Sequence, residues 1–120
     1  MRPMDQVPRV HEDTEFTALM KEMSDKGLGA CAMVSSDLMM QGVFTDGDLR
    51  RLVEKGHDLR GLKAIDVMNK NPKVILQSSM AVEAAQMMEN YKITSIFVVN
   101  DKNQICGALN SNDLMQAKVI

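Results

Sequence analysis

ACAMVSSDLMMQGVFTDGDL, residues 30–49, is matched without a gap by SIFVVNDKNQICGALNSNDL, residues 95–114. The offset of 65 residues brings Gly42 onto Gly107 and Asp48 onto Asp113. A chain that resembles itself at a fixed spacing is built from similar structural units. Further upstream, residues 8–10 align with residues 72–74 at an offset of 64, which predicts one residue gained or lost between the two matches.

Each half of the chain shows the same order of predicted elements. Apolar residues at i, i+3, i+4 and i+7 predict a helix over residues 15–26 and another over 81–91. Thr14 and Ser78 or Ser79 are the expected N-caps of these helices. A leading extended segment is expected at residues 9–11 and 73–76, a pair of strands at 30–34 and 41–44 and at 95–99 and 105–109, and a second helix from about Asp46 and about Ser111.

The predicted fold class is therefore α/β (α+β), with two β-α-β-β-α repeats packed as a pseudo-two-fold pair. We expect the first repeat at residues 1–54, a linker at 55–65 and the second repeat at 66–120. Each repeat has about 50 residues, which is too few to bury a secure core alone, so the two should share one. The cleft between them is the expected ligand site, because ligands favour such interfaces.

Composition excludes several classes of function. Fourteen basic and sixteen acidic residues give a net charge of −2, so neither a nucleic-acid nor a membrane surface is expected. No apolar run approaches the roughly 20 residues that span a bilayer. Cys31 and Cys106 lack metal-ligand spacing and are expected to be buried, reduced thiols, while the twelve methionines fill the core.

The stretch GVFTDGDLRR, residues 42–51, holds the polar residues that could carry chemistry. Thr45 and Asp48 have the spacing of a capping box at the start of a helix, which is a purely structural role. A helix N-terminus also attracts anions, so Thr45 could instead contact a phosphate and Asp48 the hydroxyls of a ribose. Both roles remain open, and they are compatible. Asp46 and Asp48 have neither the accompanying nucleophile nor the further ligands that an enzyme or a metal site would need.

These paired units, each ending in Gly-h-x-(Thr/Ser)-x-x-Asp, resemble a tandem of cystathionine-β-synthase (CBS) domains, the Bateman module. GVFTDGDLRR, LRGLKAIDVM and ITSIFVVN are more specifically similar to the CBS region of bacterial arabinose 5-phosphate isomerases, which serve Kdo and lipopolysaccharide biosynthesis. The resemblance implies a C-terminal fragment that begins inside the leading turn of the first repeat, at MRPM, and lacks the catalytic sugar-isomerase (SIS) domain, so the fragment itself is not expected to be an enzyme.

The resemblance also implies a set of ligand-binding residues. The Asp of the motif holds ribose hydroxyls and the Thr/Ser contacts phosphate, while the base lies among apolar strand residues. Carried over, the expected ligand-binding residues are Thr45, Asp48, Asp113, Asn110, Arg50, His11, Ala30 and Ser95. Asn110 departs from Thr/Ser, and a proline common in the second strand of CBS repeats is missing from both halves.

The resemblance implies a cytoplasmic regulatory module that binds a nucleotide or nucleotide-sugar effector and modulates the SIS domain. The effector would be an adenine or cytidine nucleotide, such as CMP-Kdo, and no other cofactor or metal is expected. A homodimer formed through CBS pairs, within a tetrameric parent, is the expected assembly. The alternative is a structural module that holds this assembly together and binds no ligand.

Overall fold

The computed structural model describes residues 1–79 and 81–111, which contain a 3-10 turn, four α-helices and six strands. In chain order the elements are η1 (Met4–Gln6), β1 (Arg9–Val10), α1 (Phe16–Lys26), β2 (Ala30–Val34), β3 (Met40–Thr45), α2 (Asp46–Glu54), α3 (Ala64–Val67), β4 (Val74–Leu76), α4 (Ala81–Tyr91), β5 (Ser95–Val99) and β6 (Ile105–Asn110). The predicted mixed α/β class and the predicted element order are confirmed. The second helix expected from Ser111 lies almost wholly outside the described residues.

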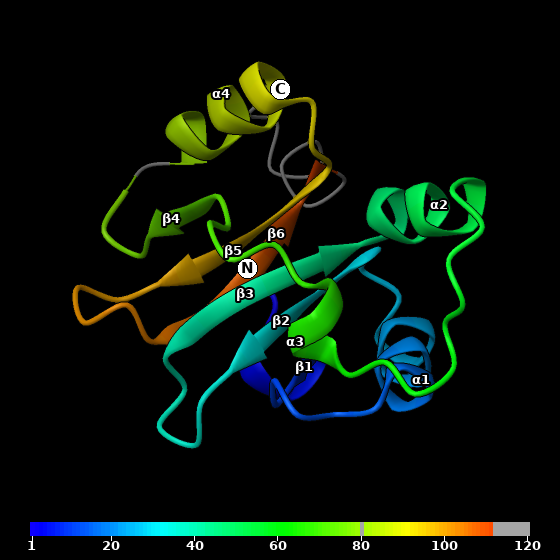
Figure 1. The fold of residues 1–120 in the computed structure, drawn as a ribbon. Helices are drawn as coiled ribbons and strands as arrows, with labels where there is room; N and C mark the ends of the chain where they lie inside the picture. Colours follow the sequence, from blue (N-terminus) through cyan, green and yellow to red (C-terminus); the bar gives the residue numbers. More distant parts are fainter. Residues whose placement is uncertain (80, 112–120) are drawn as a thin grey trace. The chain divides into compact units, whose positions relative to one another are not determined.

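Two three-stranded sheets, β1-β2-β3 and β4-β5-β6, form the framework (Figure 1). In each sheet the first strand runs parallel to the second, and the second pairs antiparallel with the third. Pro8–Pro72 forms one compact unit, and Met1–Val7 joins the chain from Lys73 onward in the other. The boundaries predicted at 1–54, 55–65 and 66–120 come from the sequence repeat and not from spatial contacts. They are not tested by these two units and stay a prediction.

The strand register follows the 65-residue repeat through each sheet. Arg9 lies opposite Ala32 in the first sheet, and Val74 lies opposite Phe97 in the second. The leading strands are therefore related by 65 residues, like the strands that follow them. The predicted offset of 64 was wrong, because the Pro8 and Pro72 that suggested it are not structural counterparts.

Backbone irregularities recur at the same offset. A shift in the β2–β3 register between Met33 and Val34 has its counterpart between Val98 and Val99. Leu38 and Asn103, in the turns that follow β2 and β5, both adopt left-handed conformations with φ of 68° and 62°. Such a conformation is uncommon for residues other than glycine, so its recurrence marks the two turns as the same structure.

A cluster of buried apolar side chains packs between the first sheet and its helices. Phe16 of α1 and Phe44 of β3 meet edge to face, with ring centroids 5.8 Å apart. This is a favourable aromatic geometry that adds to the gain from area burial. The buried members of the cluster are Phe16, Leu19, Met23, Cys31, Met33, Phe44 and Ala64. The predicted apolar face of α1 is confirmed, and methionine does contribute to the core.

The second sheet has its own apolar cluster, whose buried members among the described residues are Ile75, Ala84, Met88, Ile96 and Val98. Ala84 and Met88 of α4 are buried as the helical spacing predicts, whereas Ala81 is exposed. The exposed Ala81 is thus a local exception to the predicted buried face.

The predicted N-cap of α1 was wrong. Glu15 takes the N-cap position, and no side chain caps the helix. The Thr14 carbonyl instead accepts a hydrogen bond of 2.8 Å from the Ala64 amide, so the chain before α1 is tied to the start of α3. Ser78 and Ser79 precede a residue that the structure does not describe, and the cap of α4 lies outside the described part of the chain.

Burial separates the two cysteines, both of which are free thiols. Cys31 is fully buried, and loss of solvation, reinforced by the charge of Glu22, raises the pKa of its thiol to about 12. Cys106 is only half-buried, so the predicted burial holds for Cys31 alone. Among the described residues there is no group of three or more metal-ligating side chains, and no helix has the length and apolar character needed to cross a membrane.

Gly42 lies in the edge strand β3, where the segment that follows α3 comes close to the first sheet. Val43 and Asn69 exchange backbone hydrogen bonds of 3.0 and 2.8 Å, which adds a short antiparallel bridge beside β3. A Cβ atom on Gly42 would lie 2.7 Å from the Met68 sulfur and 2.8 Å from the Asn69 carbonyl oxygen. The glycine is therefore required for this close approach.

Gly42→Ala should lower the free energy of unfolding by about 1–3 kcal/mol, because the added methyl overpacks against backbone that is itself hydrogen-bonded. Urea unfolding followed by far-ultraviolet circular dichroism would measure the change. Gly47→Ala is the matched control, since its Cβ would lie no closer than 3.5 Å to the Arg51 guanidinium, and alanine favours the helix. Equal stability of the parent and Gly42→Ala would contradict the packing role of Gly42.

Candidate functional site

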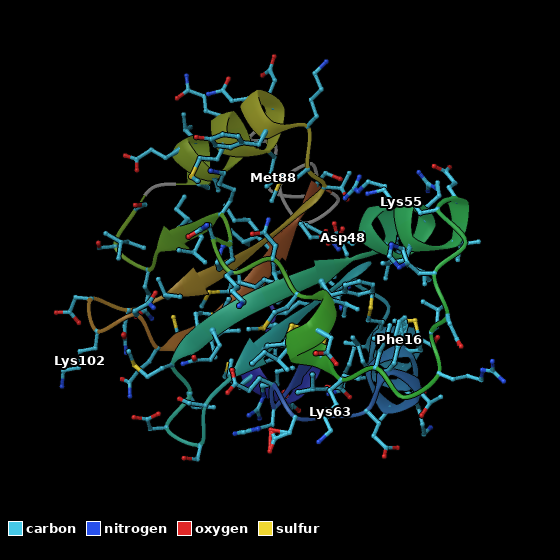
Figure 2. All side chains as sticks on the ribbon, in the orientation of Figure 1. Phe16, Asp48, Lys55, Lys63, Met88 and Lys102 are labelled. Carbon is cyan, nitrogen blue, oxygen red and sulfur yellow. The ribbon has the colours of Figure 1, made fainter. Side chains whose placement is uncertain are left out.

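Thr45 and Asp48 form a reciprocal capping box at the junction of β3 and α2. Figure 2 labels Asp48 at the start of α2. The Asp48 amide donates to the Thr45 hydroxyl oxygen at 3.2 Å, and the Thr45 amide donates to Asp48 Oδ2 at 2.9 Å. Thr45 has the extended backbone of an N-cap residue, with φ of −123°. The structural role that the spacing predicts is therefore confirmed, while the ligand-binding role stays a prediction.

The second carboxylate oxygen of Asp48 is held by Arg51. Arg51 donates from its guanidinium to Asp48 Oδ1, three residues back along α2. The Arg51 side chain is 62% exposed and that of Asp48 only 25% exposed. Exposed ion pairs of this kind are weak, so a ligand could displace Arg51 without a large loss of free energy. The helical i, i+3 spacing was the signal that could have identified this pair from sequence.

The loop before β2 is bonded to the same helix start. Ala30 lies opposite Thr45 in the β2–β3 register, and the Asp46 amide donates to the Gly29 carbonyl at 3.0 Å. Ala30, Thr45 and Asp48, which the sequence places in two separate stretches, are thus brought together at one end of the sheet.

The second sheet has the corresponding arrangement. Ser95 lies opposite Asn110, and the Ser111 amide donates to the Thr94 carbonyl at 2.9 Å. Two more of the predicted residues are therefore neighbours, at the end of the sheet where β6 finishes. Asp113, the counterpart of Asp48, lies outside the described residues.

Two predicted residues do not join the Thr45 group. His11 follows the end of β1, which runs parallel to β2, so it lies at the opposite end of the sheet from Ala30 and Thr45. There it is exposed, with its ring Nδ1 2.7 Å from Asp13 Oδ1. Arg50 is exposed on α2, and its neighbour Arg51 is the residue that contacts Asp48.

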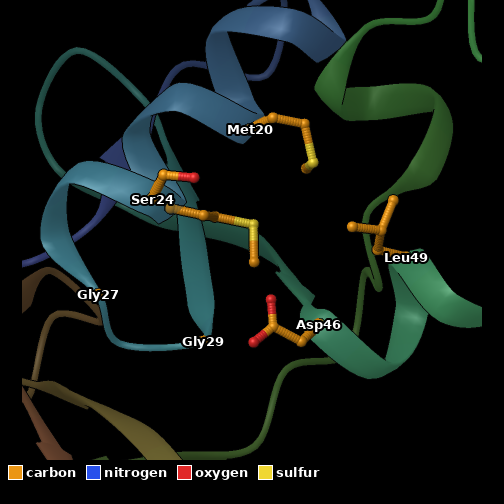
Figure 3. A pocket seen from close by; sticks show the side chains of 7 residues that line it. Met20, Ser24, Gly27, Gly29, Asp46 and Leu49 are labelled. Carbon is orange, nitrogen blue, oxygen red and sulfur yellow. The ribbon is translucent and has the colours of Figure 1, made fainter.

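A shallow pocket of about 330 Å³ lies beside this helix start, between α1 and α2 (Figure 3). Its lining residues are Met20, Met23, Ser24, Gly27, Gly29, Asp46 and Leu49. The Asp46 carboxylate points into the pocket, whereas none of the eight predicted ligand-binding residues lines it. The pocket and the predicted site therefore use different sides of the same helix start.

The charges at the start of α2 decide what it can bind. Asp46 and Asp48 both lie in the first turn, where their carboxylates already compensate the positive end of the helix dipole. A free anion would meet two negative charges there. A ligand with hydroxyl donors, such as a ribose, suits Asp48 better, and its phosphate would need a cation such as Arg51.

Thr45→Ala should lower the free energy of unfolding by about 1 kcal/mol, because the Asp48 amide loses its acceptor. Thr45→Ser restores the hydroxyl and should recover most of that loss. Urea unfolding of the three proteins under the same conditions would measure both effects. If Thr45→Ala were as stable as the parent, the capping bond would have no net role in stability.

Comparison with known proteins relates the chain to one family. Residues 64–120 match the model of the CBS domain. The whole chain is similar to the arabinose 5-phosphate isomerase KdsD of Pseudomonas aeruginosa, with 37% identity over 114 residues. That alignment covers 95% of this chain but only 35% of the isomerase. The chain thus spans about a third of the length of this curated relative.

Solved structures share the fold. A CBS domain protein from Pyrobaculum aerophilum, complexed with AMP, has a TM-score of 0.82 at 24% identity, with 95% of this chain and 85% of that chain covered. CBSX2 of Arabidopsis thaliana, also in complex with AMP, has a TM-score of 0.83 at 21% identity, with coverages of 99% and 92%. The match over residues 64–120 assigns that part of the chain to the CBS-domain family, and the whole chain shares its fold with pairs of CBS domains and is similar in sequence to part of the arabinose 5-phosphate isomerases.

Proposed function

We propose that this chain is a regulatory module that binds a nucleotide or nucleotide-sugar at the start of α2. The observation that carries the proposal is the grouping of Ala30, Thr45 and Asp48 at the end of β3. The resemblance in sequence implies that these same three residues contact a ligand. Two proteins of the same fold are complexed with AMP, which supports a nucleotide as the class of ligand.

In this proposal Asp48 divides its carboxylate between two tasks. Oδ2 keeps its 2.9 Å bond to the Thr45 amide, which holds the side chain in place. Oδ1 exchanges Arg51 for the hydroxyl donors of the ribose. The released Arg51 guanidinium can then turn to the phosphate, where a charge-assisted hydrogen bond is strong. Ala30 and Ser95 would line the two base positions, with Asn110 and Asp113 completing a second, less phosphate-adapted site.

The module would act on a longer protein. The related isomerases are about three times as long as this chain, so we place isomerase activity in a separate SIS domain of the parent and none in these residues. An effector regulates such a parent only if it binds two of its conformations with different affinity. A pathway product such as CMP-Kdo would suit feedback on a cytoplasmic enzyme of lipopolysaccharide biosynthesis.

A second candidate function is a structural module that joins copies of the parent, as a dimer within a tetramer, without a ligand. The observation that favours it is that the polar groups of the capping box already have partners within the chain. Thr45 and Asp48 are hydrogen-bonded to each other, and Asp48 also accepts from Arg51. A site needed only for folding would look the same. Ligand binding by the variants below separates the two candidates.

A thermal-shift and calorimetric screen of the chain with AMP, ADP, ATP, CMP, S-adenosylmethionine and CMP-Kdo tests the proposal. A ligand present at 100 times its dissociation constant should stabilise the protein by about 2.7 kcal/mol, a shift of several degrees. Asp48→Ala should weaken binding of that ligand at least about tenfold, since hydrogen bonds to a charged group contribute about 1.5–3 kcal/mol.

Asp46→Ala is the matched control, because it removes the same charge from the same helical turn but leaves the capping box intact. Its affinity for the ligand should equal that of the parent or rise slightly. If both variants lost the same affinity, the loss would come from the missing charge at the helix N-terminus and not from a contact between Asp48 and the ligand. If the unmutated chain is folded and none of these ligands raises its melting temperature, the structural module is favoured instead.

A further inference from the structure

The pocket of about 330 Å³ between α1 and α2 is not used by the proposed nucleotide site. It lies wholly within Pro8–Pro72, the first of the two compact units. Figure 3 shows the side chains of Met20, Leu49 and Asp46 directed toward the same space. The pocket therefore combines apolar walls with a carboxylate, and such a combination is typical of a site for a small molecule.

The Asp46 carboxylate is available to a ligand. Asp46 is exposed, and within residues 1–79 and 81–111 no group is hydrogen-bonded or ion-paired to its side chain. The carboxylate of Asp48, two residues further along α2, accepts instead from the Thr45 amide and from Arg51. The two acids of the first turn thus differ, because the chain itself occupies Asp48 and leaves Asp46 open to the pocket.

Gly29 makes room for the Asp46 carboxylate. A Cβ atom on Gly29 would lie 3.1 Å from Asp46 Oδ2, and the φ of Gly29 is +80°, a conformation that suits glycine. The Gly29 carbonyl also accepts a hydrogen bond of 3.0 Å from the Asp46 amide. The backbone therefore holds the start of α2 close to Gly29, and the missing side chain lets the carboxylate reach the pocket.

Two sources of negative charge face this space. The carbonyls in the last turn of α1 carry the partial negative charge of a helix C-terminus, and Ser24 and Gly27 line the pocket at that end. Asp46 adds a full negative charge from the other side. The two lysines of α1 are each ion-paired with an acidic residue of the same helix. The pocket therefore favours a cation and disfavours a phosphate.

The second unit differs at the corresponding positions. At the offset of 65 residues, Gly27 corresponds to Lys92 and Asp46 to Ser111. Gly27 and Lys92 both have left-handed backbones, with φ of 66° and 54°, so they are structural counterparts. A lysine near a helix C-terminus is favourable. The second unit thus has a cation of its own where the first has a glycine, and it lacks the carboxylate.

The lining selects the kind of cation. None of the described residues that line the pocket is aromatic, whereas quaternary ammonium groups are recognised by aromatic rings. A hard divalent cation needs more oxygen ligands than one carboxylate and one hydroxyl. A primary ammonium can donate to Asp46 and to the Ser24 hydroxyl, while an aliphatic stem contacts the thioethers of Met20 and Met23.

We propose that this pocket binds a small aliphatic primary amine. The ammonium group pairs with the Asp46 carboxylate, and the stem lies against Met20, Met23 and Leu49. The bound amine supplies to the C-terminus of α1 the positive charge that Lys92 adds near the end of α4 in the second unit. None of the residues assigned to the nucleotide takes part, so the two sites are separate.

Titration of the chain with 1,4-diaminobutane, followed by NMR of methionine methyl groups and backbone amides, tests the proposal. The methyl signals of Met20 and Met23 and the amide signals of Gly27 and Gly29 should move and saturate together. The methyl signal of Met88, in the second unit, should stay in place. Butylamine should move the same signals as the diamine, whereas butyrate, which has a similar stem and the opposite charge, should not.

Asp46→Asn keeps the shape of the side chain and removes its charge. It should weaken binding of the diamine about three- to fivefold, the effect of one exposed ion pair. Asp25→Asn is the matched control, because it removes an exposed carboxylate from the same end of α1 but does not line the pocket. Its affinity should equal that of the unmutated chain.

Three results would overturn the proposal. These are unmoved signals of Met20 and Met23, equal affinity of Asp46→Asn and the unmutated chain, and equal weakening by the Asp46 and Asp25 variants, which would reduce binding to the general attraction of an acidic surface. The amine titration contains no nucleotide. Its failure can therefore be told apart from failure of the nucleotide screen, and either proposal can hold without the other.

Discussion

The close approach of a distant backbone segment to a glycine is the constraint that allows each sheet to bind a further segment beside its last strand. Asn69 can bridge to Val43 only because Gly42 leaves room for Met68 and for the Asn69 carbonyl. Gly107 leaves equivalent room for Met1 and for the Arg2 carbonyl, and Arg2 bridges to Ala108. Each sheet thereby recruits a segment from outside its own three strands. The glycine of the repeated motif is explained by this close approach, without a ligand.

Asp48 shows how one residue can serve the fold and remain suited to a ligand. A carboxylate has two oxygens, and the capping box uses one of them for a bond between neighbouring elements. Within residues 1–79 and 81–111, the contact of the other oxygen is with an exposed arginine, Arg51, in an interaction that costs little to break. A cap therefore fixes the orientation of the side chain before a ligand arrives. Preorganisation of this kind lowers the entropic cost of binding.

Sequence periodicity predicted the bounds of helices and strands better than it predicted which distant segments pair with them. The bounds of β2, β5 and α4 match the expected residues, because alternation and helical spacing act within a short window. The grouping of Ala30 with Thr45 also followed from the predicted pairing of two neighbouring strands.

Pairings between distant segments leave no such periodic signature. The bond from Ala64 to Thr14 took the place of the expected cap, and the bridge from Asn69 to Val43 was not foreseen. Differences between the two repeats carry the remaining information. The first unit keeps Thr45 and fills its core with Phe16 and Phe44, while the second has Asn110, Ala81 and Leu109 at the same positions. The two repeats share one register, but the second lacks the Thr45 hydroxyl that caps α2 in the first and has smaller side chains in place of Phe16 and Phe44. The register depends on backbone pairing and tolerates these exchanges, whereas the cap and the core depend on the side chains themselves.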